Sequence, residues 1–325
     1  NWGISDKNIA LTHGSQSAFF SLFNSFAGKT GNRKRHILLP ITPEYIGYSD
    51  LGIEDQMFVS RSPQIEKLPD QFFKYHIDFN QLQITADTGL ICVSRPTNPS
   101  GNVLTDQECA QLDQLAQQHQ VPLLLDNAYG TPFPHIIFND VNPFWNDNTI
   151  VCLSLSKLGL PGVRTGIVVA REDIIAAYAN ANGIVNLACG NIGPAIATGL
   201  FRSGAILDLT REHVTPFYRE RAQQVVRWFR KGMTGLPCRM HKPEGAFFLW
   251  LWLEGLPQGC TALYRRLKQR GVLIVPGRHC FFGLEEDWTH RDECIRVSYV
   301  QDEGAVRRGV AIICDEVRRM YDEAG

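Results

Sequence analysis

The sequence has almost no net charge and lacks any long apolar run. Its 32 Lys and Arg residues stand against 33 Asp and Glu, for a formal net charge of −1. No overall electrostatic field therefore draws the chain to nucleic acid or to anionic lipid. No apolar segment reaches the ~20 residues that a membrane-spanning helix needs. We expect neither a nucleic acid nor a membrane as partner, and an anionic ligand has to be held by a local site.

Paired cysteine motifs are also lacking. The nine cysteines are odd in number, scattered, and form neither a CxxC motif nor a Cys/His cluster. We therefore expect no disulfide framework, no metal, and a reduced cytoplasmic setting. Residues 1–3 have no signal-peptide character. Because the chain starts without Met and almost at once enters a strand-like segment, we expect a further segment upstream of Asn1.

The chain does contain a regular alternation of short apolar runs and helical patterns. Five runs, apolar at nearly every position, predict strands covered on both faces: residues 36–39, 89–93, 121–125, 149–155 and 166–170. Between two of them, Thr105 and Glu108 form a capping box that predicts a helix to about residue 119. This order predicts an open α/β sheet, mostly parallel and flanked by helices, with ligands at the carboxyl ends of its strands.

The pattern changes after residue 201. A long helix is predicted near residues 211–231, followed by an apolar segment, a shorter helix, a strand and a closing helix: residues 245–253, 261–269, 295–300 and from Asp302 onward. We therefore predict a large domain over residues 1–203 and a smaller C-terminal α+β domain over residues 204–325.

Several of the predicted strands end in residues that can carry chemistry. Lys157 follows the strand over 149–155, and a glycine-punctuated loop leads on to Arg164. The alternative for Lys157 is a solvated lysine in a flexible turn. Asp126 and Tyr129 follow the strand over 121–125. A buried carboxylate needs a partner, and the alternative for Asp126 is a helix N-cap.

Weaker signals lie elsewhere in the chain. Asn98 opens an Asn-Pro-Ser-Gly turn, although Asn-Pro also begins ordinary turns. Residues 14–16 form a Gly-Ser-Gln turn before a helical run, suited to a phosphate or to a simple serine cap. Tyr45 follows the strand over 36–39 and could stack on a ligand or pack in the core. Arg296 lies within an apolar strand, so it points outward or binds an anion.

In this order, the segments resemble fold-type I aminotransferases, which carry pyridoxal phosphate on a lysine. The resemblance implies that Lys157 holds this cofactor covalently, as a desolvated amine can. It further implies that Gly14, Ser15 and Gln16 cradle the cofactor phosphate together with Ser154 and Arg164. Many family members have eight residues from lysine to arginine, where this chain has seven, from 157 to 164.

The same resemblance implies roles for the remaining residues. Asp126 holds the pyridine nitrogen protonated, Tyr129 bonds to the cofactor's phenolic oxygen, and Tyr45 stacks on the ring. Asn98 reaches both the phenolic oxygen and the substrate carboxylate, which Arg296 binds. The residues expected to act in catalysis are Lys157, Asp126 and Tyr129, whereas Tyr48 and His13 are expected to be structural.

Four longer segments resemble the members of this family that exchange an amino group between valine and pyruvate: residues 43–48, 94–99, 156–162 and 242–250. This resemblance implies two half-reactions with small-molecule substrates, giving 2-oxoisovalerate and alanine. It also implies a homodimer. The stretch over residues 179–201 has no charged side chain, which suits a buried contact and a pocket for neutral substrates.

Three alternatives remain. Aminotransferases of other neutral amino acids, C–S lyases and decarboxylases share this fold and its lysine. A regulator built on an aminotransferase-like domain would normally carry a basic helix-turn-helix, and the sequence shows none. A nicotinamide-type dinucleotide enzyme would need a GxGxxG motif after a strand, which is also absent.

Overall fold

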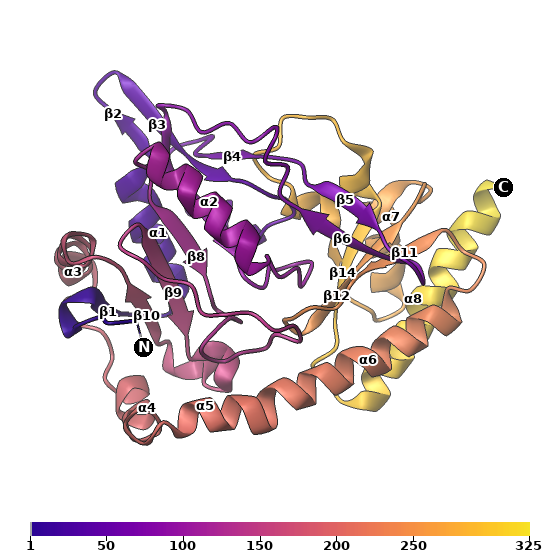
Figure 1. Cartoon of the computed structure of the whole chain (residues 1–325). Coiled ribbons are helices and arrows are strands. Elements are labelled where there is room, and N and C mark those ends of the chain that lie inside the picture. The colour runs from indigo at the N-terminus through magenta and orange to yellow at the C-terminus, as the bar shows by residue number, and fades with distance from the viewer. Residues whose placement is uncertain (1) are drawn as a thin grey trace.

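The computed structural model describes residues 2–325, so Asn1, the first residue of the predicted large domain, lies outside the described residues. Two sheets organise the described chain (Figure 1). The first has the order β1-β10-β9-β8-β7-β3-β2, with β4 beside β3. Its strands are β1 (Ile9–Thr12), β2 (Gly28–Thr30), β3 (Arg33–Leu39), β4 (Phe58–Ser60), β7 (Thr88–Ser94), β8 (Leu123–Asp126), β9 (Thr149–Ser154) and β10 (Gly166–Val169).

The core of this sheet is parallel, as predicted. β4, β3, β7, β8 and β9 pair in parallel, whereas β10, β1 and β2 pair antiparallel with their neighbours. All five predicted strands belong to it, with ends shifted by a few residues. β8 begins at Leu123 rather than at the predicted residue 121, since Pro122 has no N–H for a ladder hydrogen bond.

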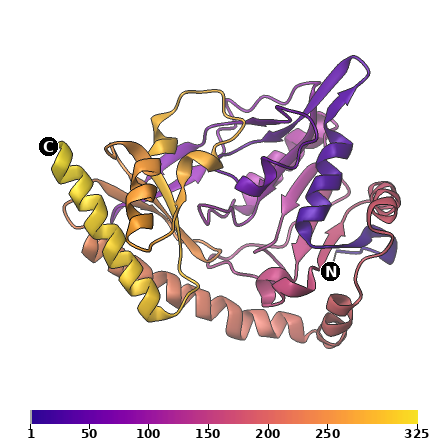
Figure 2. The same cartoon turned by 180° about the vertical axis from the view of Figure 1, so that it is seen from behind.

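Helices cover both faces of the first sheet. They are α1 (Ser15–Phe26), α2 (Asp106–Gln118), α3 (Glu172–Asn186) and α4 (Ile192–Ser203). α2 lies over the face seen in Figure 1, and α1 lies over the opposite face, seen in Figure 2. Ile37 and Leu39 pack in the core beneath α1, and Leu38 packs in the core beneath α2. This alternation explains why these strands are apolar at successive positions. The capping box is confirmed, because Thr105 accepts a hydrogen bond from the Glu108 amide.

The second sheet has the order β13-β14-β12-β11-β6-β5. Its strands are β5 (Gln64–Lys67), β6 (Phe72–His76), β11 (Cys238–His241), β12 (Phe248–Leu253), β13 (Val275–Pro276) and β14 (Cys294–Ser298). β5 and β6 thus join strands from the C-terminal part, a pairing that the sequence analysis did not include. The helices of this part are α5 (Ala205–Leu209), α6 (Thr215–Gly232), α7 (Gly259–Gln269) and α8 (Glu303–Ala324).

One long helical segment connects the two parts of the molecule. α5 continues through a π-helical turn, Thr210–Val214, into α6, and the segment runs along the first sheet and on to the second (Figure 1). The π turn lies just before Pro216, whose missing N–H interrupts the regular hydrogen-bond ladder. Short 3₁₀ turns cover Asp6–Asn8, Ile46–Tyr48, Ser156–Leu158, Pro161–Val163, Gly277–Cys280 and Thr289–Asp292. None of the helices between residues 2 and 325 is both long and apolar enough to cross a membrane.

Candidate active site

A cavity of about 300 Å³ lies at the carboxyl ends of β7, β8 and β9. Most of the predicted site residues line it: Ser15, Gln16, Tyr45, Asn98, Asp126, Tyr129, Ser154, Lys157 and Arg164. The two others adjoin it, since Gly14 lies against Arg164 and Arg296 bonds to Asn98. The structure therefore brings together all the residues that the sequence motifs singled out. Phe19, Ser94, Pro96, Ala128, Ser156 and Pro161 complete the wall.

Lys157 lies three residues beyond the end of β9, in the turn Ser156–Leu158. Its ammonium nitrogen lies 5.4 Å from the centre of the Tyr129 ring and 5.5 Å from that of Phe247. Burial lowers the pKa of Lys157, the charges of Arg296 and Arg164 lower it further, and Asp126 opposes them. The amine is thus partly buried beside two aromatic rings, and a larger fraction of it is neutral than in water.

Asp126 is the last residue of β8 and is buried. Its Oδ2 accepts a hydrogen bond from the Tyr48 hydroxyl at 2.6 Å, and its Oδ1 accepts one from the Ala128 amide at 2.9 Å. No helix begins here, so the N-cap alternative is wrong. Burial raises the pKa of Asp126, while the bonds from Tyr48 and Ala128 and the charge of Lys157 oppose that rise. These groups favour a carboxylate facing the cavity.

Tyr48, expected from the sequence to be structural, contacts the predicted site residue Asp126. It is fully buried and holds Asp126 in place. Its ring packs edge to face against Tyr45, with centroids 5.2 Å apart, and its amide donates to the Tyr45 carbonyl in a tight turn. The only signal in the sequence was the spacing of three residues between two tyrosines that follow β3.

A cradle for an anion lies at the start of α1. The helix has Gly14 at its N-cap and no side-chain cap, so amide N–H groups of its first turn remain available. The Ser15 hydroxyl donates to the Leu153 carbonyl at 3.1 Å, which excludes the simple serine cap. Gly14 has φ +79°, and a Cβ there would lie 2.4 Å from Nη2 of Arg164. The glycine therefore lets the guanidinium approach the helix terminus.

Arg296, on β14, points toward the cavity and not outward. Its Nη1 donates to Oδ1 of Asn98 at 2.6 Å, and its guanidinium carbon lies 5.1 Å from the centre of the Phe248 ring. Its Nε is buried without a hydrogen-bond partner, and no carboxylate within residues 2–325 forms an ion pair with it. A half-buried cation without a counterion, whose buried Nε has no partner, favours an anionic ligand.

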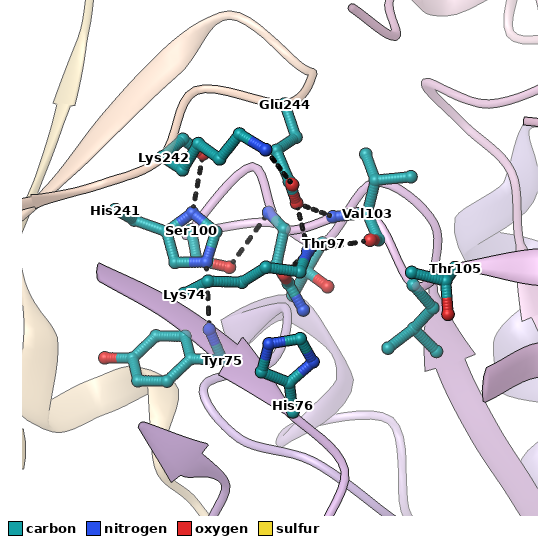
Figure 3. A network of polar contacts seen from close by, with 12 residues as sticks. Lys74, Tyr75, His76, Thr97, Ser100, Val103, Thr105, His241, Lys242 and Glu244 are labelled. Atoms are coloured by element: carbon teal, nitrogen blue, oxygen red, sulfur yellow. Dashed lines mark hydrogen bonds and ion pairs between the residues drawn. The ribbon is translucent and has the colours of Figure 1, made fainter. Parts of the chain in front are cut away.

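A buried ion pair connects the turn that carries Asn98 to the second sheet (Figure 3). Lys74 on β6 pairs with Glu244 and donates to Asn102 Oδ1 and to the Val103 carbonyl, each at 3.0 Å. Glu244 also accepts a hydrogen bond from the Val103 amide at 3.1 Å. We name these four residues the interdomain clamp. No local motif in the sequence indicates this clamp, because Lys74 and Glu244 are 170 residues apart.

The parallel sheet order, with a lysine, a carboxylate and an anion cradle meeting at its carboxyl edge, is the arrangement of fold-type I aminotransferases. The model of the family "Aminotransferase class I and II" matches residues 60–313, and the chain belongs to this family. It is therefore an enzyme of the transferase class, as the sequence motifs implied.

Relatives that match nearly the whole chain support this assignment. Valine–pyruvate aminotransferase of Escherichia coli (strain K12) is 51% identical over 99% of this chain and 78% of its own length. The crystal structure of a putative amino-acid aminotransferase from Psychrobacter arcticum 273-4 has a TM-score of 0.97 and 46% identity, covering 99% of this chain and 76% of that one. The crystal structure of valine–pyruvate aminotransferase from Salmonella typhimurium LT2 has a TM-score of 0.94 and 51% identity, covering 99% of this chain and 81% of that one.

Proposed function

We propose that this aminotransferase uses pyridoxal phosphate on Lys157 to exchange an amino group between L-valine and pyruvate, giving 2-oxoisovalerate and L-alanine. The observation that carries the proposal is the position of Lys157, a partly buried amine of lowered pKa that lines one cavity with Asp126 and the anion cradle. The substrates are inferred from the relatives of 51% identity, whose names state valine and pyruvate.

The chemistry of the cavity fits this cofactor. The first turn of α1, Ser154 and Arg164 provide donors for a phosphate, and Asp126 would provide, as a carboxylate, an acceptor for a protonated ring nitrogen. Tyr129 and Asn98 lie on the wall where a phenolic oxygen needs donors, and Tyr45 offers a ring to stack on. When bound, pyridoxal phosphate supplies a carbonyl carbon that accepts the amino group and a ring that takes up electrons.

The residues of the chain then divide the remaining work. Arg296 and Asn98 orient the substrate carboxylate, so that the α-carbon lies near the Lys157 amine. Nζ of Lys157, once neutral, takes the proton from the substrate α-carbon and would deliver it to the carbonyl carbon that the cofactor supplies, and its lowered pKa favours the neutral base. Asp126 contributes a fixed negative charge in a dry site, where it acts strongly because little water screens it.

The uncharged stretch over residues 179–201 supports a preference for neutral substrates and a homodimer. Several of its apolar side chains are exposed in the single chain, among them Ile184, Leu187 and Ile192 at 84%, 90% and 71%. Such a surface suits a partner subunit. An acidic substrate side chain that reached this surface would lose water without gaining a cation, at a cost of several kcal/mol. A valine side chain instead gains about 0.8 kcal/mol per buried methylene.

The free state of all nine cysteines, eight of which are buried, accords with a reducing cytoplasmic location, which we propose for the enzyme.

For the assembly, we expect sedimentation of the active enzyme to give a dimer. A fully active monomer at the assay concentration would exclude interfacial active sites.

Two measurements test the catalytic proposal. Borohydride reduction followed by peptide mapping should attach the cofactor to Lys157, and a label on another lysine would exclude the assignment. Half-reactions with valine, alanine, 2-aminobutyrate, aspartate and glutamate should be fast only for the neutral amino acids. Faster reaction of aspartate or glutamate than of valine would contradict the proposed substrates. Turnover without an oxo acid would instead indicate a C–S lyase or a decarboxylase.

A further inference from the structure

Glu44 is a second carboxylate in the core, next to Asp126, and it has no role in the chemistry described above. It is fully buried between β3 and the Ile46–Tyr48 turn, and its amide donates to the Cys280 carbonyl at 2.9 Å. Within residues 2–325 no Lys, Arg or His forms an ion pair with it. A buried carboxylate without a cation is costly in its charged form.

Hydrogen bonds connect Glu44 to Asp126 through two hydroxyl groups. Oε2 of Glu44 lies 2.7 Å from Oγ of Ser94, and Oε1 accepts a hydrogen bond from the Ser94 amide at 2.8 Å. Oγ of Ser94 lies 3.2 Å from the Tyr48 hydroxyl, and that hydroxyl donates to Asp126 at 2.6 Å. All four side chains are buried.

The number of hydroxyl protons in this row of hydrogen bonds distinguishes a protonated from an ionised Glu44. Tyr48 has one hydroxyl proton and gives it to Asp126, so Ser94 has to donate to Tyr48 for their contact to be a hydrogen bond. Ser94 also has one hydroxyl proton, so it can then only accept from Glu44. With Tyr48 donating to Asp126, all three contacts are satisfied together only if Glu44 is protonated. If Glu44 is ionised, Ser94 turns its proton to Glu44, and its contact with Tyr48 has no proton left. A proton on Asp126 would instead reverse all three donations, so the contacts require one proton on the pair and the surrounding charges decide which carboxyl holds it.

We propose that Glu44 carries a proton and that, through Ser94 and Tyr48, it acts as a positioning residue that keeps the single negative charge of this buried pair on Asp126. The consequence for the cofactor's ring nitrogen rests on the proposed function, since it requires pyridoxal phosphate to be bound beside Asp126. The protonation of Glu44 itself does not.

The groups around Glu44 agree with this assignment. Burial raises the pKa of Glu44 to about 8, its hydrogen bonds from Ser94 and from the Tyr45 amide lower it, and the nearby Asp126 raises it. The other titratable groups that face it are Tyr48, Cys92 and Cys280, and burial raises the pKa of each, so all three stay neutral at neutral pH. Asp126, by contrast, has the Lys157 ammonium nearby. The negative charge is therefore more stable on Asp126 than on Glu44.

Infrared spectroscopy of the cofactor-free chain tests the protonation directly. At neutral pH the unaltered chain should show the carbonyl stretch of a buried carboxylic acid. This band should disappear in Glu44→Gln and should titrate with a pKa of about 8 in the unaltered chain. If the unaltered chain shows no carboxylic acid band at neutral pH, or if the band survives in Glu44→Gln, the proposal is wrong whether or not the chain is a transaminase.

The cofactor-loaded enzyme tests the connection to Asp126. Tyr48→Phe removes a hydrogen bond to a charged group, so cofactor affinity should fall roughly tenfold to hundredfold, and the pH titration of the cofactor's absorbance should shift. Glu44→Gln keeps a donor toward Ser94, although it loses the acceptor for the Tyr45 amide. It should bind cofactor more tightly than Tyr48→Phe and lose the alkaline transition of the absorbance.

Tyr75→Phe is the matched control. Tyr75 is a fully buried tyrosine on β6, bonded to Trp250 and His290 and away from Asp126. This variant should lose stability but keep both the cofactor affinity and the absorbance titration of the unaltered chain. If Tyr75→Phe shifted the absorbance titration as much as Tyr48→Phe, or if Tyr48→Phe left it unchanged, the hydrogen bonds from Glu44 to Asp126 would not determine the charge of Asp126.

Discussion

The interdomain clamp offers the sharpest test of how the structure holds its site together. Lys74 and Glu244 are only 6% and 2% exposed, and their side chains form an ion pair. Replacing Lys74 by Met leaves Glu244 with the Val103 amide and with Lys242, which is 3.6 Å away and half exposed. It also removes the donor to Asn102 and to the Val103 carbonyl.

We expect Lys74→Met to lower the free energy of unfolding by up to about 3–5 kcal/mol, the cost of removing one partner of a buried ion pair, because the half-exposed Lys242 replaces Lys74 only in part. The double variant Lys74→Met/Glu244→Gln removes that charge as well. This double variant still leaves Asn102 Oδ1 and the Val103 carbonyl without the donor that Lys74 provided, which should lower the free energy of unfolding by about 1–3 kcal/mol. The double variant should therefore be more stable than the Lys74→Met variant alone.

Urea denaturation, followed by tryptophan fluorescence, measures these differences. Lys67→Met is the matched control, because Lys67 on the adjacent strand β5 pairs with Glu254 at 3.3 Å but is 52% exposed. Its loss should cost less than about 1 kcal/mol. The clamp does not stabilise the fold as an ion pair if Lys74→Met costs no more than Lys67→Met, or if the double variant costs the sum of Lys74→Met and Glu244→Gln measured singly.

Three further predictions follow from the site and the clamp. Asp126→Ala should lower transamination by orders of magnitude and keep the fold, since it removes the charge facing the cavity; near-normal turnover would contradict its role. Gly14→Ala should weaken cofactor binding measured by equilibrium dialysis, because its Cβ displaces Arg164, whereas Gly31→Ala, also at positive φ but with nothing within 4 Å, should not. Burial alone would raise the pKa of Glu244, but Lys74 and His241 hold it below its usual 4.5. The stability from this lowered pKa is present above about pH 4.5 and is lost as the pH falls through the folded-state pKa. Between these pH values the free energy of unfolding should therefore fall less in Lys74→Met/Glu244→Gln than in the unaltered chain, as measured by acid denaturation.

Local pattern in the sequence was enough to predict five of the eight strands of the first sheet and the residues that follow them. Apolar runs covered on both faces, a capping box and the residues after β7, β8 and β9 are properties of short segments. Because parallel strands bring their carboxyl ends to one edge, predicting the strands also predicted that Asn98, Asp126 and Lys157 meet at one cavity.

The partners of the buried polar groups were decided only by the tertiary structure. Tyr48 reaches Asp126 across 78 residues, Arg296 reaches Asn98 across 198, and β5 and β6 leave the N-terminal part to pair with the second sheet. No local pattern specifies such pairs, since a tyrosine or a glutamate in a turn has the same neighbours in sequence whether it faces solvent or the core. Burial decides the difference, because a polar group without water has to find its partner wherever the packing of the whole chain places one.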